Sequence, residues 1–223
     1  MKRNQSGFTL IEIAIVLVII GLLLGGVLKG QELINSAKVK NLASDFKNIP
    51  VFIYGYQDKF KSLPGDDKAA VTHVAATTNG NGNGVIDGNW NDAASSVPET
   101  VNFWQHVRLA LLAPGPTVTT DAAYIPTNTV GGIIGVQSGT AVIANTPIKD
   151  LSATPVAIRG SYIICSAGIL GKFAKQLDTT MDDGNTATGS MMATPTTGYS
   201  LGAAATANAS IDDALTYTVC MGI

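Results

Sequence analysis

Hydrophobic residues are concentrated in one uninterrupted stretch near the start of the chain. Residues 8–28 carry a single charge, Glu12. These 21 residues would form about 31 Å of helix, close to the ~30 Å thickness of a bilayer core. Lys2 and Arg3 precede the stretch, and positive flanking residues stay in the cytoplasm. The pattern predicts one transmembrane helix, with the chain beyond Lys29 outside the cytoplasm.

The helical pattern continues beyond this apolar stretch. Apolar residues recur at a spacing of three to four between residues 31 and 60, including Leu33, Ile34, Ala37, Val39, Leu42, Phe46, Ile49 and Ile53. Pro50 predicts a kink, and Leu63-Pro64-Gly65 predicts the end of the helix. We therefore expect one long helix, the alternative being two helices that separate at Pro50.

The pattern beyond residue 65 predicts shorter elements in one outer domain. The expected elements are a helix over 99–112 with Phe103, Trp104, Val107 and Leu111 inward, strands over 156–164 and 215–221, and a helix over 167–177. Residues 184–210 are rich in Thr, Ala, Gly and Asn, which is typical of a surface loop. No second domain boundary or internal repeat is evident.

Composition excludes several classes of function. Charged residues make up 13% of the chain and the formal net charge is −2, so there is no basic patch for nucleic acid and no nucleic-acid-binding motif. His73 and His106 are the only histidines, which is too few for a convincing catalytic metal centre. Ser161 and Ser166 lack the context of a nucleophilic serine. The sequence therefore predicts a protein without enzyme activity.

The residues around the apolar stretch differ from an ordinary secretory signal. No small-residue cleavage site follows Leu28, whereas Gly7 and Phe8 stand directly before the stretch. A cut between these two residues would create an α-amino group four residues upstream of Glu12. That amine would be a partner for a carboxylate in an apolar span, which is otherwise costly. The alternative is that Glu12 lies near the headgroups and extends toward water.

The sequence Gly7-Phe8-Thr9-Leu10-Ile11-Glu12, followed by apolar residues, resembles the class III signal of type IV pilins and type II secretion pseudopilins. The resemblance implies that a prepilin peptidase cuts after Gly7 and methylates the new N-terminus at Phe8. It divides the chain into a leader (1–7), a transmembrane and filament-core helix (8–28), an amphipathic continuation (29–62) and a head domain (63–223). It implies an α+β, pilin-like fold, with the long helix packed on an antiparallel sheet.

The same resemblance implies a structural role in a filament. Glu12 would pair with the N-terminal amine of a neighbouring subunit, and an inner-membrane assembly platform would assemble the subunit with other pilins. Many major pilins have a proline about twenty residues into the mature helix, where this chain has Lys29. A minor pilin or pseudopilin therefore stays an alternative. The alternative from another class is a membrane-anchored binding or adhesin module that does not polymerise.

A second, broader resemblance is to a recurrent set of prepilin-type proteins without a well-defined biochemical role. The residues that carry it are Leu63-Pro64-Gly65-Asp66, the Asn/Gly loop at 79–87, Glu99 with Trp104 and His106, and Asp182-Asp183-Gly184 before Gly189.

Two cysteines, Cys165 and Cys220, both fall in the part expected outside the cytoplasm. An oxidising compartment favours a disulfide between them. By chain entropy such a bridge is worth roughly 4 kcal/mol. It would resemble the disulfide-closed C-terminal region of many pilins. A metal pair or a catalytic thiol would need further His or Cys partners.

Two segments are candidates for binding calcium. In the first, Asn79, Asn81, Asn83, the carbonyl of Val85 and Asp87 follow the order of an EF-hand loop. Trp90 stands where the closing Glu belongs, and Asn-Gly runs also form plain turns.

The second candidate is the acidic segment of Asp178, Asp182 and Asp183, which precedes Gly184. Major pseudopilins bind calcium near their C-terminal region, although their ligand spacing does not transfer to these residues. The alternative is an acidic turn that ends a helix.

Overall fold

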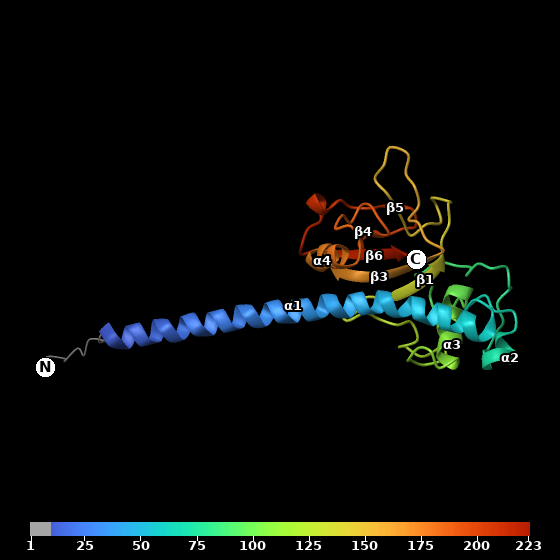
Figure 1. Ribbon diagram of the computed structural model, residues 1–223, viewed down its shortest axis with the longest axis horizontal. Helices are drawn as coiled ribbons and strands as arrows, with labels where there is room; N and C mark the ends of the chain where they lie inside the picture. The colour runs from blue at the N-terminus through green and yellow to red at the C-terminus, as the bar shows by residue number, and fades with distance from the viewer. Residues whose placement is uncertain (1–9) are drawn as a thin grey trace. The chain divides into compact units, whose positions relative to one another are not determined.

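The structure is a computed structural model that describes residues 10–223. It divides into two compact units, one up to Lys38 and one from Val39 to Ile223. The first helix, α1 (Leu10–Phe60), begins in the first unit and ends in the second (Figure 1). All other helices and strands in the described part of the chain belong to the second unit, which we call the head.

Helix α1 is a single helix of 51 residues, with Pro50 inside it. The expected long helix is confirmed, and the alternative of two helices is wrong. Within the head, its buried residues are Val39, Leu42, Ala43, Phe46, Ile49, Ile53 and Tyr56. They recur every three or four positions, so they form one apolar stripe along the helix. This stripe is the part of α1 that packs into the core of the head.

The head is built on a four-stranded antiparallel sheet in the order β1-β3-β6-β4. Its strands are β1 (Ile134–Ser138), β3 (Tyr162–Leu170), β4 (Met191–Pro195) and β6 (Thr216–Gly222). A long N-terminal helix followed by this sheet confirms the expected α+β class and is consistent with a pilin-like fold.

Each face of the sheet contributes to a separate apolar cluster, because successive residues of a strand point to opposite faces. Ile164 of β3 and Val219 of β6 belong to the cluster that includes the stripe of α1. Their neighbours Ile163, Cys165 and Cys220 belong to the other cluster. The sheet is therefore buried on both faces.

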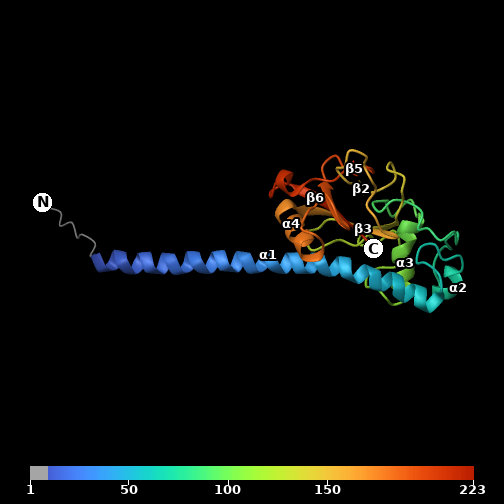
Figure 2. The same cartoon turned by 45° about the horizontal axis from the view of Figure 1, so that its top comes forward.

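The second face is covered by irregular chain and a small sheet. The strands β2 (Ile148–Lys149) and β5 (Ala203–Ala204) pair in parallel. They lie on the side of the large sheet opposite α1 (Figures 1 and 2). Ile148 packs with Trp90 and Ile163 in the same cluster.

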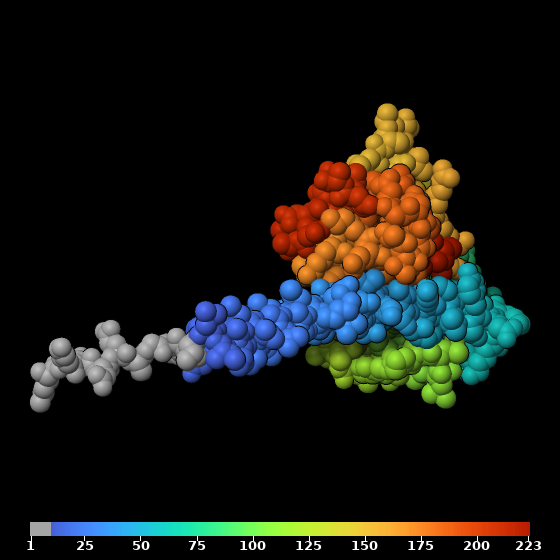
Figure 3. All heavy atoms as spheres, turned by 60° about the vertical axis from the view of Figure 1, so that its left-hand side comes forward, coloured from blue at the N-terminus to red at the C-terminus, as the bar shows by residue number. Residues whose placement is uncertain are grey.

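Three further helices complete the head, together with a short 3-10 helix at Asn208–Ser210. They are α2 (Ala70–Val74), α3 (Glu99–Leu109) and α4 (Gly171–Met181). Figure 3 shows the head portion of α1 between the segment around α3 and the segments of the sheet. Helix α4 follows β3 directly and packs Phe173, Ala174 and Leu177 into the main cluster.

Several expected boundaries are corrected by the structure. The strand expected over 156–164 lies at Tyr162–Leu170, and the helix expected over 167–177 begins only at Gly171. Leu111, expected inward, is 90% exposed, because α3 ends at Leu109. The final strand matches its prediction to within one residue at each end.

The expected surface loop over 184–210 is also wrong in its centre. Strand β4 occupies Met191–Pro195 and pairs with β6, with its first four residues buried. The weak β propensity of Met-Met-Ala-Thr-Pro gives little local signal. The strand forms because its neighbour β6 supplies backbone partners and an apolar environment.

Candidate functional site

The Asn/Gly loop that follows α2 folds around Asp66. The Asp66 side chain is buried, and its carboxylate accepts hydrogen bonds from three consecutive backbone N–H groups. The donor–acceptor distances are 2.6 Å for Gly82, 3.0 Å for Asn83 and 2.8 Å for Gly84. Gly82 and Gly84 have φ angles of 74° and 87°, a region that glycine adopts easily. The loop is thus a backbone cradle for one carboxylate.

Glu99, at the start of α3, fixes both ends of the same loop. Its carboxylate accepts the N–H of Asn81 at 2.8 Å and the N–H of Asp87 at 3.0 Å. Burial raises the pKa of Glu99, while these two N–H groups act in the opposite direction. The loop is therefore tied to a helix of the core.

The side chains proposed as calcium ligands in this loop are engaged in hydrogen bonds of the protein. The carboxylate of Asp87 accepts from the amides of Asn81 and Asn83, at 2.7 and 2.9 Å. The side-chain oxygen of Asn79 accepts the N–H of Val71, and that of Asn83 accepts the N–H of Val85. The structure brings the five residues into one loop, and calcium binding there stays a prediction.

Two histidines lie beside this loop in different environments. The Nδ1 atom of His106 accepts the N–H of Gly65 at 2.9 Å, and the ring is completely buried. Burial lowers the pKa of His106 to about 4, against smaller opposing effects of the Thr78 backbone and the Asp67 charge. His73 Nδ1 lies 2.7 Å from the carboxylate of Asp67.

Asp67 connects the loop region to α1. Its carboxylate accepts the hydroxyl of Tyr56 at 2.8 Å. Burial alone would raise the pKa of Asp67, but hydrogen bonds from His73, Ala69 and Tyr56 bring it below its ordinary value. The carboxylate therefore serves as a buried, fully partnered link between α1 and α2.

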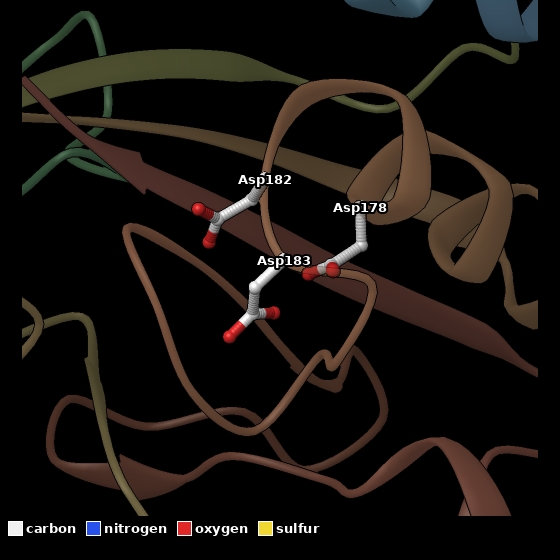
Figure 4. A group of neighbouring side chains, drawn as sticks. All are labelled: Asp178, Asp182 and Asp183. Carbon is white, nitrogen blue, oxygen red and sulfur yellow. The ribbon is translucent and has the colours of Figure 1, made fainter.

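The second candidate calcium site lies where α4 ends. Asp178, Asp182 and Asp183 each offer an oxygen atom, and these atoms lie within 4.8 Å of one another. Figure 4 shows Asp178 projecting from α4 toward the turn that carries Asp182 and Asp183. Among residues 10–223, this is the group of acidic side chains whose spacing suits a metal ion. We call these three residues the acidic turn.

Within the acidic turn, Asp178 is the unusual member. It lies on the face of α4 that also carries Ala174 and Leu177, and it is 0% exposed. Neither of its carboxylate oxygens has a hydrogen-bond partner of normal geometry among the described residues, although the backbone N–H groups of Gly184 and Asn185 lie close enough to act on its charge. Burial and the charges of Asp183 and Asp182 raise its pKa to about 7, against the backbone amides of Gly184 and Asn185.

The other two acids hold the loop that leads to β4. Asp182 accepts the N–H of Met191 at 2.8 Å and the hydroxyl of Ser190 at 3.0 Å. Asp183 accepts the N–H of Asn185 and the hydroxyl of Thr188, both at 2.8 Å. The sequence indicated this acidic group, but it gave no signal that Asp178 points into the core.

The two cysteines form the expected disulfide. Cys165 of β3 and Cys220 of β6 lie directly opposite each other in the antiparallel pair and are joined. Both are fully buried in the cluster on the face opposite α1. The bridge therefore links two central strands of the sheet.

The N-terminal part of α1 carries the last group of predicted residues. Gly7 and Phe8 lie outside the described residues, and Glu12 lies in the first turn of α1. From Leu10 to Leu28 every residue is exposed. Within the described chain, α1 is the one helix that is long and apolar enough to cross a membrane.

A family model described as the prokaryotic N-terminal methylation motif matches residues 2–28. The chain carries a prepilin-type signal. This signal marks type IV pilin-like proteins, which are structural rather than enzymatic. The comparisons with curated proteins and with solved structures found no match.

The match has direct consequences for the N-terminal residues. It includes Gly7, Phe8 and Glu12, and it ends at Leu28, the last residue of the apolar stretch. The motif and the apolar helix together fit the precursor of a membrane-anchored, pilin-like protein.

The sequence singled out Asp66 only within the broader resemblance and indicated neither its role in the loop nor the separate roles of the acids in the acidic turn. Asp66 stands 16 residues before the first amide that it binds, so no local motif joins them. Some of the residues behind the broader resemblance lie together, since Asp66 and Glu99 hold the Asn/Gly loop and His106 accepts the N–H of Gly65, whereas Asp182 and Asp183 lie at the acidic turn.

Proposed function

We propose that this protein is a structural subunit of a type IV pilus-like filament, assembled through its N-terminal helix after processing. The observation that supports this most strongly is the exposed apolar surface within the prepilin-type signal. Leu17, Leu22 and Leu28 are 64%, 73% and 66% exposed. Such a surface is unfavourable in water and requires lipid or other apolar helices around it.

The same helix can serve in both environments. Before assembly, its 8–28 stretch spans the bacterial inner membrane as a single pass, with the N-terminus in the cytoplasm and the head outside. After assembly, equivalent helices of neighbouring subunits replace the lipid in a periplasmic or extracellular filament. Gly21 and Gly25 have open space around them and form a small-xxx-small spacing, which lets helices approach closely.

Glu12 sets the axial register between subunits. A prepilin peptidase cuts after Gly7 and methylates Phe8, which leaves a positive amine at the start of the helix. The carboxylate of Glu12 pairs with the amine of a neighbouring subunit. In an apolar environment this ion pair forms in one relative position only, because any other leaves a buried charge without a partner.

Other pilins and an inner-membrane assembly platform are the partners in this proposal. Within the class, a minor pilin or a type II secretion pseudopilin is the second candidate. Lys29, at the place where many major pilins have proline, favours it. A major subunit would dominate purified filaments, whereas a minor subunit would be scarce in them.

The first test is mass spectrometry of the N-terminal peptide, from the membrane fraction and from sheared surface material. A methylated Phe8 terminus in sheared filaments is the expected result. The same terminus in membranes alone would favour a pseudopilin or minor subunit. An intact Met1 terminus would contradict the proposal and leave a membrane-anchored binding or adhesin module.

The second test separates assembly from anchoring. Glu12→Ala should reduce the yield of sheared filaments roughly tenfold or more, because breaking a buried ion pair costs several times the ~1.4 kcal/mol that corresponds to a factor of ten. Cleavage after Gly7 should continue. The control is Glu32→Ala on the same helix, which removes an exposed ion pair with Lys29 and should leave assembly unchanged. Equal yields from both variants would favour the non-polymerising module.

A further inference from the structure

The acidic turn contains a buried carboxylate whose charge no basic side chain of the described residues balances and which the amides of Gly184 and Asn185 offset only in part. Asp178 is completely buried, and neither of its oxygens accepts a hydrogen bond. Burying an ionised carboxylate without partners is among the most costly arrangements in a protein. Its nearest acidic neighbours, Asp182 and Asp183, increase that cost by repulsion.

No basic side chain compensates this charge among the ion pairs of residues 10–223. The nearest ion pair along α4 joins Lys175 to Asp213 rather than to the acidic turn. A positively charged ligand from solution would therefore remove the main electrostatic cost of the site. Asp183 is exposed and Asp182 half-buried, so solvent reaches the group from their side.

We propose that Asp178, Asp182 and Asp183 bind a calcium ion at the end of α4. The donor atoms are all oxygen, which suits a hard cation and excludes the nitrogen and sulfur sites typical of zinc or copper. The oxygens of Asp182 and Asp183 each accept one hydrogen bond, and each has a second lone pair for a metal. Water molecules complete the six to eight ligands of calcium.

Calcium suits this irregular set better than magnesium. Magnesium demands near-ideal octahedral geometry, whereas calcium accepts uneven ligand sets with bidentate carboxylates. The ligands come from a helix and the turn that follows it. We expect a dissociation constant of about 10⁻⁴–10⁻³ M, the range of extracellular calcium modules.

The ion would stabilise the connection between α4 and β4. Asp182 and Asp183 already hold Met191, Ser190, Asn185 and Thr188. A calcium ion that bridges these two acids to Asp178 would fix the same loop to the core-facing side of α4. Strand β4 begins at Met191, so the site would also stabilise the edge of the sheet.

The test is thermal unfolding of the full chain in detergent micelles, followed by tryptophan fluorescence. Trp90 and Trp104 are both buried in the head and report its unfolding. Calcium at a hundredfold excess over its dissociation constant should raise the Tm by roughly 5–10 °C relative to EDTA. Magnesium at the same concentration should raise it less.

Two variants connect the effect to the acidic turn. Asp178→Asn keeps the shape of the side chain, removes its charge and should abolish the calcium-dependent rise. In EDTA the same variant should unfold at a higher temperature than the unmodified chain, because it carries no unbalanced buried charge. Asp183→Asn, at an exposed position, should fold normally and weaken calcium binding roughly tenfold, as expected for the loss of one charged ligand.

The matched control is Asp213→Asn, which removes an exposed carboxylate paired with α4 and should retain the full response to calcium. A calcium titration calorimetry experiment on the same four proteins provides the direct binding constants. The proposal is wrong if calcium leaves the Tm of the unmodified chain unchanged, or if Asp183→Asn binds calcium as tightly as Asp213→Asn. Either result would leave Asp178 as a buried carboxyl group that folds in its protonated form.

Discussion

Asp66 and Asp178 are both buried carboxylates beside a loop, but they are satisfied in opposite ways. Asp66 is 4% exposed and accepts hydrogen bonds from three backbone N–H groups of the Asn/Gly loop. Asp178 is 0% exposed and accepts none. The loop around Asp66 directs three N–H dipoles at its carboxylate, whereas at the acidic turn two further negative charges and burial outweigh the amides of Gly184 and Asn185.

This difference separates two segments that look alike as calcium candidates in the sequence. Asn81, Asn83 and Asp87 use their side chains to hold their own loop, and Asn79 accepts the N–H of Val71 in α2. Asp178 accepts no hydrogen bond of normal geometry among the described residues. A buried acid without partners indicates a ligand more strongly than a loop that resembles a binding motif, because only the former has an energetic need for a cation.

The largest effect in this comparison should come from Asp66→Ala. Three backbone N–H groups would lose a charged acceptor inside a folded loop, which should lower the free energy of unfolding by about 3–5 kcal/mol. Urea unfolding of the full chain in micelles, followed by tryptophan fluorescence, measures the change. The calcium response at the acidic turn should persist.

Asp66→Asn is the matched variant for that measurement. It keeps one oxygen for Gly82 and Asn83 but turns an NH₂ group toward the N–H of Gly84. Its cost should therefore lie between those of the unmodified chain and Asp66→Ala. If the free energy of unfolding falls by less than ~1 kcal/mol in both variants, water replaces the carboxylate as the acceptor. The hydrogen bonds of Asp66 would then not distinguish it from Asp178.

A second test uses the buried imidazole beside Asp66. Burial lowers the pKa of His106 to about 4, from an unfolded value near 6.5. Between these values the unfolded chain binds more protons, so stability is complete above pH 6.5 and falls as the pH decreases toward 4. The contribution of His106 to this loss should be roughly 3 kcal/mol.

His106→Asn isolates this contribution, because it keeps an acceptor for the N–H of Gly65 and cannot titrate. The carboxylates near the ring, including Asp67 and Glu99, titrate in both chains. The difference between the two unfolding curves from pH 6.5 to 4 therefore reports the imidazole. Parallel curves would mean that His106 has the same pKa in the folded and the unfolded chain.

The smallest effect is expected from Asp87→Ala. Asp87 is exposed and accepts only the side-chain amides of Asn81 and Asn83, so stability should fall by about 1 kcal/mol or less. The midpoint of the calcium titration should not change. A lost calcium response in this variant would indicate that calcium binds at the Asn/Gly loop and not at the acidic turn.

Most of the N-terminal half of the protein could be predicted from the sequence. The apolar stretch after Gly7 identifies the prepilin-type signal, and the recurrence of Leu42, Phe46, Ile49 and Ile53 predicts the face of α1 that enters the core. Both signals are local, because a helix repeats every 3.6 residues and needs no distant partner to be recognised.

The C-terminal half was predicted less well. The strand–helix boundary at Leu170–Gly171 lies several residues from its expected place, and β4 was expected to be a loop. Strand β4 depends on a neighbour, β6, that comes more than twenty positions later in the chain. Side-chain pairing across strands, rather than local propensity, decides such an element.

The sequence by itself determined the apolar stretch, the prepilin-type signal, the long helix and the pairing of the two available cysteines. Only the tertiary structure decided which acids are satisfied and which are not. Asp66, Asp87 and Asp178 look equivalent in the sequence. Their difference arises from the donors that the fold brings to each carboxylate, which are backbone N–H groups at Asp66, side-chain amides at Asp87 and no donor of normal geometry at Asp178. Hydrogen bonding and burial depend on residues distant in the chain, so they exist only once the chain is folded.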